Sequence, residues 1–378
     1  MMRRVTTRLA LVLGGLVVAL LLAEGVLRLF APGSVYSYPG QLYREHPTRY
    51  YEMVPGFHGT MSQADYSFEF RLNELGYRER GLDALPEGPR VWLLGDSLVF
   101  GQGVDAERVM SVQLETALAN DGGPATVVNG GVGGYGTVNT VAQLRDHVDA
   151  VAPDLVIVTL NLSNDIEDNL LAPEMIVRGG YLGRARAGGT APSAADVWLR
   201  AHLRSYQVVR RVLEGARGPV EVHQEDQIFQ VPMPPPDEAP HFVELARGGP
   251  VNERIQSMLD ATDHALGELA AEATTRGLPI GVVIMPGSFN FRPAELQQVA
   301  RHARVPDGQV DSTRIVDRAR ALVEGHGLPM LDLCPIFSAA PDPGALTFRY
   351  DTHYSAEGHR LAAESMAPWV GQLLARHD

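Results

Sequence analysis

The stretch that decides the fold is Val91-Trp92-Leu93-Leu94-Gly95-Asp96-Ser97-Leu98-Val99-Phe100-Gly101-Gln102-Gly103-Val104. Its first four residues are apolar without alternation, which is typical of a short strand buried on both faces. Gly95 ends this strand, and the pattern becomes helical over about Ser111 to Leu118. A serine at such a strand-to-helix turn, here Ser97, has backbone N–H groups beside its hydroxyl that could stabilise an oxyanion in acyl transfer. Gly-Asp-Ser is also an ordinary strand-ending turn, so the tripeptide gains weight only from residues downstream.

Similar apolar runs recur along the chain and alternate with helical segments. Further short strands are predicted over Thr126 to Val128, Leu155 to Leu160, Ile280 to Met285 and Pro329 to Leu333. Further helices are predicted over Val141 to Val151, about Val251 to Arg276, about Asp311 to Glu324 and about Ala356 to Ala375. Alternation of this kind produces a parallel sheet with helices on both faces. The sequence therefore predicts an α/β domain with a parallel five-stranded sheet over residues 89–378.

The N-terminus carries an apolar segment behind arginines. The run from Leu9 to Phe30 reaches the length of about 20 residues that a bilayer requires, and Arg3, Arg4 and Arg8 precede it. This order favours a cytoplasmic N-terminus. A cleaved signal peptide is the alternative, but the residues around Ala23 are a poor cleavage site. We therefore predict a cytoplasmic tip and transmembrane helix over residues 1–31, which attaches the protein to the cytoplasmic membrane and leaves the rest on the periplasmic side.

Two segments depart from the α/β alternation. Residues 32–88 are polar and aromatic, and Tyr66 to Leu72 alternates as a strand does, so we predict a small β-rich extension followed by a turn over Asn73 to Tyr77. An insertion is predicted at about 168–249, with a flexible stretch at Ala187 to Ser193, a possible helix at Trp198 to Leu213 and an exposed loop at Val231 to Pro240. This insertion is either a surface insertion or a cap over the substrate. The second interpretation is suggested by its start at the end of a strand, where ligands of such folds bind.

Composition excludes several classes of function. The net charge of −13 argues against a nucleic-acid partner, which needs a basic surface. The single cysteine, Cys334, excludes an intramolecular disulfide and a cysteine-rich metal site, and its apolar surroundings predict a buried strand thiol. The histidines lack the paired spacing of metal ligands, so neither a metal nor another cofactor is expected.

Three further motifs carry residue types suited to acyl-transfer chemistry. The glycine-rich run from Asn129 to Thr137 offers free backbone N–H groups to a ligand; it lacks the lysine of a phosphate loop, so an oxyanion donor fits better. The run from Asn161 to Asp165 offers an asparagine amide as another donor. Near the C-terminus, His353 could serve as a general base, and Asp351 could fix its tautomer. His359, close to a predicted helix start, is interpreted as structural.

With these motifs, the chain resembles the SGNH, or GDSL-type, hydrolases from about Arg90 to the C-terminus. Gly95-Asp96-Ser97-Leu98 resembles the block around the serine nucleophile. Asn129 to Gly134 resembles the glycine-bearing block, and Leu162-Ser163-Asn164-Asp165 resembles the Gly-x-Asn-Asp block with leucine in place of glycine. The resemblance implies a flavodoxin-like three-layer sandwich, with Ser97 as nucleophile and Ser97, Gly134 and Asn164 as the oxyanion hole.

The last block of the family is usually Asp-x-x-His, whereas this chain has Asp351-Thr352-His353, one residue shorter. A similar short spacing occurs in branches that include periplasmic polysaccharide O-acetyltransferase-like proteins. The resemblance implies that His353 is the base and that Asp351 orients it.

Three functions follow as hypotheses. The first is a serine esterase that hydrolyses a small-molecule or carbohydrate ester, such as an O-acetyl group of an envelope carbohydrate, outside the cytoplasmic membrane. The second is an O-acyltransferase that passes the acyl group to a polysaccharide. The third is a non-catalytic carbohydrate-binding or assembly protein on the same scaffold, which the presence of Ser97, Asn164 and His353 disfavours.

Overall fold

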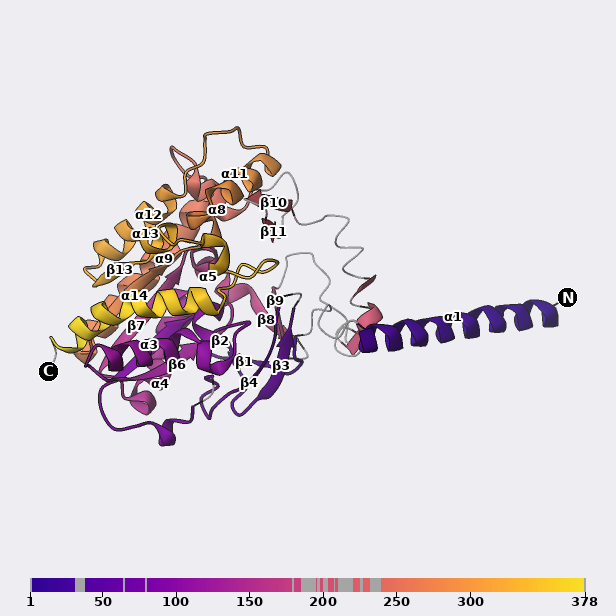
Figure 1. The fold of residues 1–378 in the computed structure, drawn as a ribbon, viewed down its shortest axis with the longest axis horizontal. Helices are drawn as coiled ribbons and strands as arrows, with labels where there is room; N and C mark the ends of the chain where they lie inside the picture. The colour runs from indigo at the N-terminus through magenta and orange to yellow at the C-terminus, as the bar shows by residue number, and fades with distance from the viewer. Residues whose placement is uncertain are drawn as a thin grey trace.

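The apolar runs of the sequence form one parallel sheet in the computed structural model (Figure 1). Its strands lie in the order β6-β5-β7-β12-β13, with bounds β5 (Arg90–Gly95), β6 (Thr126–Gly131), β7 (Leu155–Asn161), β12 (Ile280–Met285) and β13 (Met330–Asp332). All residues of β6, β7 and β12 are buried, as expected for strands covered on both faces. Counted along the chain, this order is 2-1-3-4-5, the flavodoxin-like arrangement. The predicted α/β fold with five parallel strands is confirmed.

The structure describes residues 2–30, 38–63, 65–78, 80–178, 180–184, 195, 198–199, 203–206, 208–209, 220–224, 227–231 and 239–376. The predictions for Ala187 to Ser193, for most of Trp198 to Leu213 and for most of Val231 to Pro240 therefore lie outside the described residues.

Alternating side chains of the sheet build two cores, one on each face. Trp92 and Leu94 belong to the core beneath α4 (Thr137–Val151), α9 (Glu253–Arg276) and α12 (Thr313–Gly325). Val91 and Leu93 belong to the core beneath α3 (Met110–Asn120), α13 (Cys334–Ser338) and α14 (Ala356–Leu374). The sheet is thus the middle layer of three. Cys334 is buried as predicted, but it begins α13 and does not lie in a strand.

Shorter elements complete the α/β body and the insertion. The helices are α2 (Ser97–Phe100), α5 (Asp165–Leu171), α8 (His241–Ala246), α10 (Ser288–Phe291) and α11 (Pro293–His302). Two antiparallel hairpins belong to the insertion: β8 (Met175–Arg178) with β9 (Tyr181–Arg184), and β10 (Val220–Gln224) with β11 (Gln227–Val231).

The extension before the sheet folds into two antiparallel hairpins, β1 (Tyr43–His46) with β2 (Tyr50–Met53) and β3 (His58–Ser62) with β4 (Ser67–Arg71). Phe70 of β4 packs against Phe100 with ring centroids 5.3 Å apart. Arg78 is buried and donates hydrogen bonds to the carbonyl oxygens of Phe100, Gly101 and Val104. The extension is therefore fastened to the segment that directly follows Ser97.

The N-terminal segment forms one helix, α1 (Met2–Phe30), which projects away from the α/β body (Figure 1). Over the residues that the structure describes, no helix combines the length and the apolar character needed to cross a membrane. The predicted transmembrane helix over Leu9 to Phe30 is thus not found. The helix carries two charged residues near its end, Glu24 and Arg28, whose side chains lie 2.7 Å apart, and charges of this kind are costly inside a bilayer.

Candidate active site

Ser97 begins α2 directly after β5, at the carboxyl end of the sheet. Asp96 caps the helix: its Oδ1 accepts the N–H of Leu98 at 2.8 Å, and its Oδ2 accepts the side-chain amide of Asn161 at 2.8 Å. Asp96 is fully buried, and burial raises the pKa of its carboxyl group. β5 lies between β6 and β7, where the strand order reverses, and ligands of open α/β sheets bind at such a point. The fold therefore presents the Ser97 hydroxyl at the expected ligand edge.

A chain of hydrogen bonds joins Ser97 to residues near the C-terminus. Ser97 Oγ lies 2.8 Å from His353 Nε2, and His353 Nδ1 lies 2.5 Å from Asp351 Oδ1. The backbone N–H of His353 donates to the same oxygen at 3.0 Å. Asp351 Oδ1 thus accepts both N–H groups of a residue two positions away, which is why a single residue between the two suffices.

The charges of this pair favour an ionised aspartate beside the imidazole. Burial opposes the charge of Asp351, but the imidazole of His353 and hydrogen bonds from His353 and Tyr66 outweigh it and lower the pKa of Asp351 to about 2. Burial works against the imidazolium of His353, but Asp351 outweighs it and raises the pKa of His353 above its ordinary value of 6.5. Proton transfer to His353 is therefore favoured near neutral pH.

Asn164 caps the start of α5 after β7, on the same side of the sheet as Ser97. Its side-chain amide donates to Asp168 Oδ2 at 2.6 Å. Burial raises the pKa of Asp168 to about 6. The neighbouring Asp165 is fully buried, and its Oδ2 accepts the backbone N–H of Asn161. The amide of Asn164 is thus held by the half-buried carboxyl group of Asp168, which the sequence analysis did not single out.

Gly134 lies in the loop after β6 and adopts a positive φ of 79°. A Cβ there would lie 2.9 Å from the Tyr51 hydroxyl oxygen and 3.4 Å from a side-chain carbon of Leu182, so glycine is required. Tyr51 also donates a hydrogen bond to the carbonyl of Gly133 at 3.3 Å. The glycine loop is consequently packed between the extension and the β8–β9 hairpin.

Two residues that sequence reasoning missed join the network, Tyr66 and Gln102. The Tyr66 hydroxyl donates to Asp351 Oδ2 at 2.7 Å, and Gln102 Nε2 donates to the Tyr66 hydroxyl at 3.0 Å. Tyr66 was noted only as part of a strand pattern, and no local signal indicates a contact with a residue 285 positions away. His359, by contrast, accepts the backbone N–H of Met110 while fully buried, and burial lowers its pKa to about 3, which agrees with the predicted structural role.

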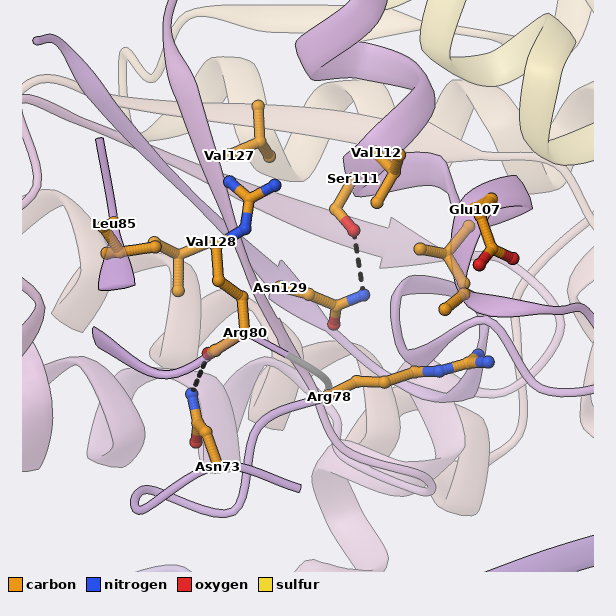
Figure 2. Close-up of a pocket in the computed structure, with 12 residues that line it drawn as sticks. Asn73, Arg78, Arg80, Leu85, Glu107, Ser111, Val112, Val127, Val128 and Asn129 are labelled. Carbon is orange, nitrogen blue, oxygen red and sulfur yellow. Dashed lines mark hydrogen bonds between the residues drawn. The ribbon is translucent and has the colours of Figure 1, made fainter. Parts of the chain in front are cut away.

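A separate pocket lies beside the edge strand β6 (Figure 2). Asn129 points toward Ser111 there, with its Nδ2 3.1 Å from Ser111 Oγ, and the same amide donates to the carbonyl of Val99. Asn129, the first residue of the glycine-rich motif, thus ties β6 to α2 and α3. The lining residues of this pocket do not include Ser97, Asp351 or His353.

Comparisons with known proteins find sequences related to this chain. The sequence model of the GDSL-like Lipase/Acylhydrolase family matches residues 93–361. An arylesterase of Vibrio mimicus is 34% identical over 77 residues, which are 20% of this chain and 38% of the arylesterase, so the chain spans well under half the length of that relative.

Solved structures with similar topology include a psychrotrophic esterase, EstA, from Pseudoalteromonas sp., with 11% identity, a TM-score of 0.38 and coverage of 76% of this chain and 100% of that one. A lipase/acylhydrolase from Enterococcus faecalis has 14% identity, a TM-score of 0.37 and coverage of 75% and 96%. An acetyl xylan esterase, AlAXEase, has 12% identity, a TM-score of 0.39 and coverage of 74% and 99%. Likeness at this level carries no inference about the substrate of this chain.

Proposed function

Because the chain belongs to the GDSL-like lipase/acylhydrolase family, we propose that it is a serine esterase whose catalytic triad is Ser97, His353 and Asp351. The observation that carries this proposal is the continuous hydrogen-bond chain from Ser97 Oγ through His353 to Asp351. A hydroxyl, an imidazole and a carboxylate in this arrangement are the groups that nucleophilic catalysis at an ester requires.

In the proposed reaction, Ser97 Oγ attacks the ester carbonyl carbon while His353 Nε2 takes the hydroxyl proton. Asp351 holds the proton on His353 Nδ1 and stabilises the imidazolium that forms. The backbone N–H groups of Ser97 and Gly134 and the amide of Asn164 would donate to the oxyanion. His353 then protonates the departing alcohol, and water, deprotonated by the same imidazole, releases the acid from the acyl-enzyme.

A fluorophosphonate probe tests the nucleophile directly, because it forms a covalent bond only with an activated serine. The folded protein should be labelled at Ser97, as read by peptide mass spectrometry, and Ser97→Ala should not be labelled. Ser111→Ala is the matched control, since Ser111 lies in the separate pocket (Figure 2) and its loss should leave labelling intact. Folded wild-type protein that resists the probe would instead support the binding-protein hypothesis.

We infer that the substrate is an ester of a carbohydrate, such as an O-acetyl group. Tyr350 supports this inference, because it is 38% exposed and immediately precedes Asp351. An exposed ring with an apolar body and a polar tip suits the face of a sugar. Tyr350→Ala should raise KM for acetylated oligosaccharides and leave the turnover of a small para-nitrophenyl acetate unchanged. Equal loss on both substrates would contradict the inference.

Transfer to a polysaccharide hydroxyl is the second candidate function, because the short Asp351-to-His353 spacing resembles acetyltransferase-like branches. Both reactions share the acyl-enzyme and differ only in the acceptor. Incubation with a labelled acetyl donor and a polysaccharide separates them: label in free acetate supports hydrolysis, and label on the polysaccharide supports transfer.

We propose that the active site works outside the cytoplasmic membrane. The arginines that precede the apolar run of Leu9 to Phe30 support this location, because a basic segment before an apolar run is also typical of an export signal peptide. Protease added to intact spheroplasts should degrade the α/β domain, whereas a cytoplasmic control protein should survive. Protection of the domain would place the enzyme in the cytoplasm.

A further inference from the structure

We propose that the tip of the β3–β4 hairpin is part of the catalytic apparatus, with Tyr66 as a positioning residue for Asp351. The proposal deepens the function proposed above and rests on the triad of Ser97, His353 and Asp351. Tyr66 lies outside residues 93–361, which the family model matches. The inference therefore concerns a feature that this chain adds to the shared domain.

The Tyr66 hydroxyl donates to the carboxylate oxygen of Asp351 that accepts no hydrogen bond from His353. Asp351 Oδ1 accepts from His353, whereas Oδ2 accepts from Tyr66 at 2.7 Å. Both oxygens are thus hydrogen-bonded, from opposite ends of the carboxylate, and the plane of the carboxylate is fixed. Tyr66 is only 8% exposed, so water does not readily replace its hydroxyl.

Gln102 determines the direction in which the Tyr66 hydroxyl donates. Its Nε2 donates to the Tyr66 oxygen at 3.0 Å, so one lone pair of that oxygen is occupied and the hydroxyl proton points to Asp351. The backbone N–H of Gln102 in turn donates to the carbonyl of Ser97 at 3.1 Å. The hydrogen bonds therefore form a closed circuit that runs from Ser97 through His353, Asp351, Tyr66 and Gln102 back to Ser97.

Packing holds the Tyr66 ring in this position. The ring of Phe348 lies 4.7 Å from it between centroids. Gly103 passes so close that a Cβ there would lie 2.4 Å from Phe348 and 2.9 Å from Tyr66. Beside it, Asp65 Oδ2 accepts the backbone N–H of Tyr350 at 2.5 Å. The hairpin tip thus contacts the loop of Asp351 at three neighbouring points, through a side chain, a ring and a backbone amide.

The variant Tyr66→Phe removes the hydroxyl and keeps the ring. Without this donor, Asp351 loses both a restraint and a partner that shares its charge. We expect kcat/KM for para-nitrophenyl acetate to fall roughly tenfold or more, the scale of a hydrogen bond to a charged group, with the loss mainly in kcat. The acidic limb of the kcat/KM–pH profile should move to higher pH. Without the Tyr66 hydroxyl, the negative charge of Asp351 is less offset and raises the pKa of His353 further.

Tyr77→Phe is the matched control. Tyr77 is also a buried tyrosine, and its hydroxyl makes a hydrogen bond of 2.6 Å with His147, away from the triad. This variant should lose comparable thermal stability but keep the pH profile and kcat. If Tyr66→Phe matches Tyr77→Phe in kcat and in pH profile while Ser97→Ala is inactive, the hairpin proposal is wrong and the proposed function stands. An active Ser97→Ala would overturn the proposed function itself.

A second variant covers the case in which Tyr66→Phe does not fold. Gln102→Leu leaves Tyr66 in place and removes only the amide that directs its hydroxyl. It should shift the acidic limb in the same direction by a smaller amount. The downfield proton resonance of His353 Nδ1–H should move in the same variant. An unchanged resonance and an unchanged profile in folded Gln102→Leu would overturn the proposal.

Discussion

Replacement of Asp351 by asparagine tests how the short Asp-x-His motif works. Asp351 Oδ1 accepts two N–H groups of His353, and Oδ2 accepts the Tyr66 hydroxyl. An asparagine amide can turn its oxygen or its NH₂ group toward His353. The NH₂ group would face the backbone N–H of His353, a donor against a donor, so the oxygen should stay on that side. Asp351→Asn should therefore retain the reactive tautomer of His353 and lose the negative charge, together with the hydrogen bond from the Tyr66 hydroxyl, which would face the NH₂ group.

The size of this loss follows from the charge that the site stabilises. The pKa of Asp351 is lowered from its ordinary 3.8 to about 2. At about 1.4 kcal/mol per pKa unit, this corresponds to about 2 kcal/mol of preference for the carboxylate, on the order of 10- to 100-fold in rate if all of it supports the imidazolium. A flipped tautomer would cost far more, on the order of 10⁴ in kcat by analogy with serine proteases.

The assay is steady-state hydrolysis of para-nitrophenyl acetate by wild-type and Asp351→Asn protein across pH. We expect kcat to fall by about 10- to 100-fold, and the acidic limb to move to lower pH because the group that raises the pKa of His353 is gone. A loss near 10⁴ would refute the argument that the backbone N–H of His353 selects the amide orientation. Full activity alongside an inactive His353→Ala would show that another group orients His353.

The remaining predictions concern the rest of the site and its charges. Ser97→Ala and His353→Ala should each abolish turnover, and the double variant should be little worse than either single one; additive losses in single-turnover rates would show that the two residues do not act as a unit. Asn164→Ala should lower kcat by about 10²–10³ with a smaller change in KM, whereas a change confined to KM would argue against an oxyanion donor. For the wild type, kcat/KM should fall as pH drops through a pKa of His353 that lies above 6.5, and a limb below that value would contradict the raised pKa. The hydrogen bond with His241 and nearby arginines lower the pKa of Glu167 from 4.5 to about 2, so its stabilisation is complete above about pH 4.5 and is lost as pH falls toward 2; Glu167→Gln should flatten this part of the Tm–pH curve, and an unchanged curve would refute the assignment.

The strands of the parallel sheet were predictable because a strand that is buried on both faces consists of a short run of apolar residues. β12 has the predicted bounds, and β7 differs from its prediction by one residue. The same logic failed where a segment is short or follows a proline: α10 lies directly after Pro286 and Gly287, α11 begins at Pro293, and neither helix was predicted. Three of the four strands of the extension were missed because β1, β2 and β3 lack the alternation of apolar and polar residues that revealed β4.

The sequence motifs predicted Ser97, Asp351 and His353 as catalytic candidates. The structure places them within hydrogen-bond distance of one another along the chain Ser97–His353–Asp351. Tyr66 and Gln102 were not predicted, because their contacts depend on how the hairpins pack onto α2. No local sequence pattern indicates that packing. The transmembrane prediction used the apolar length of the run and the arginines before it, and gave too little weight to Glu24 and Arg28 within the run.

The hydrogen-bond circuit also has a temporal consequence for a chain that is made from its N-terminus. Ser97 leaves the ribosome long before Asp351 and His353, which lie close to the C-terminus. Until α14 has been synthesised and has packed against α3, the serine has no base and no partner for its hydroxyl proton. A chain made only as far as α12 therefore holds Ser97 without its base, and the serine hydroxyl gains a proton acceptor only after residues 351–353 and α14 have joined the fold.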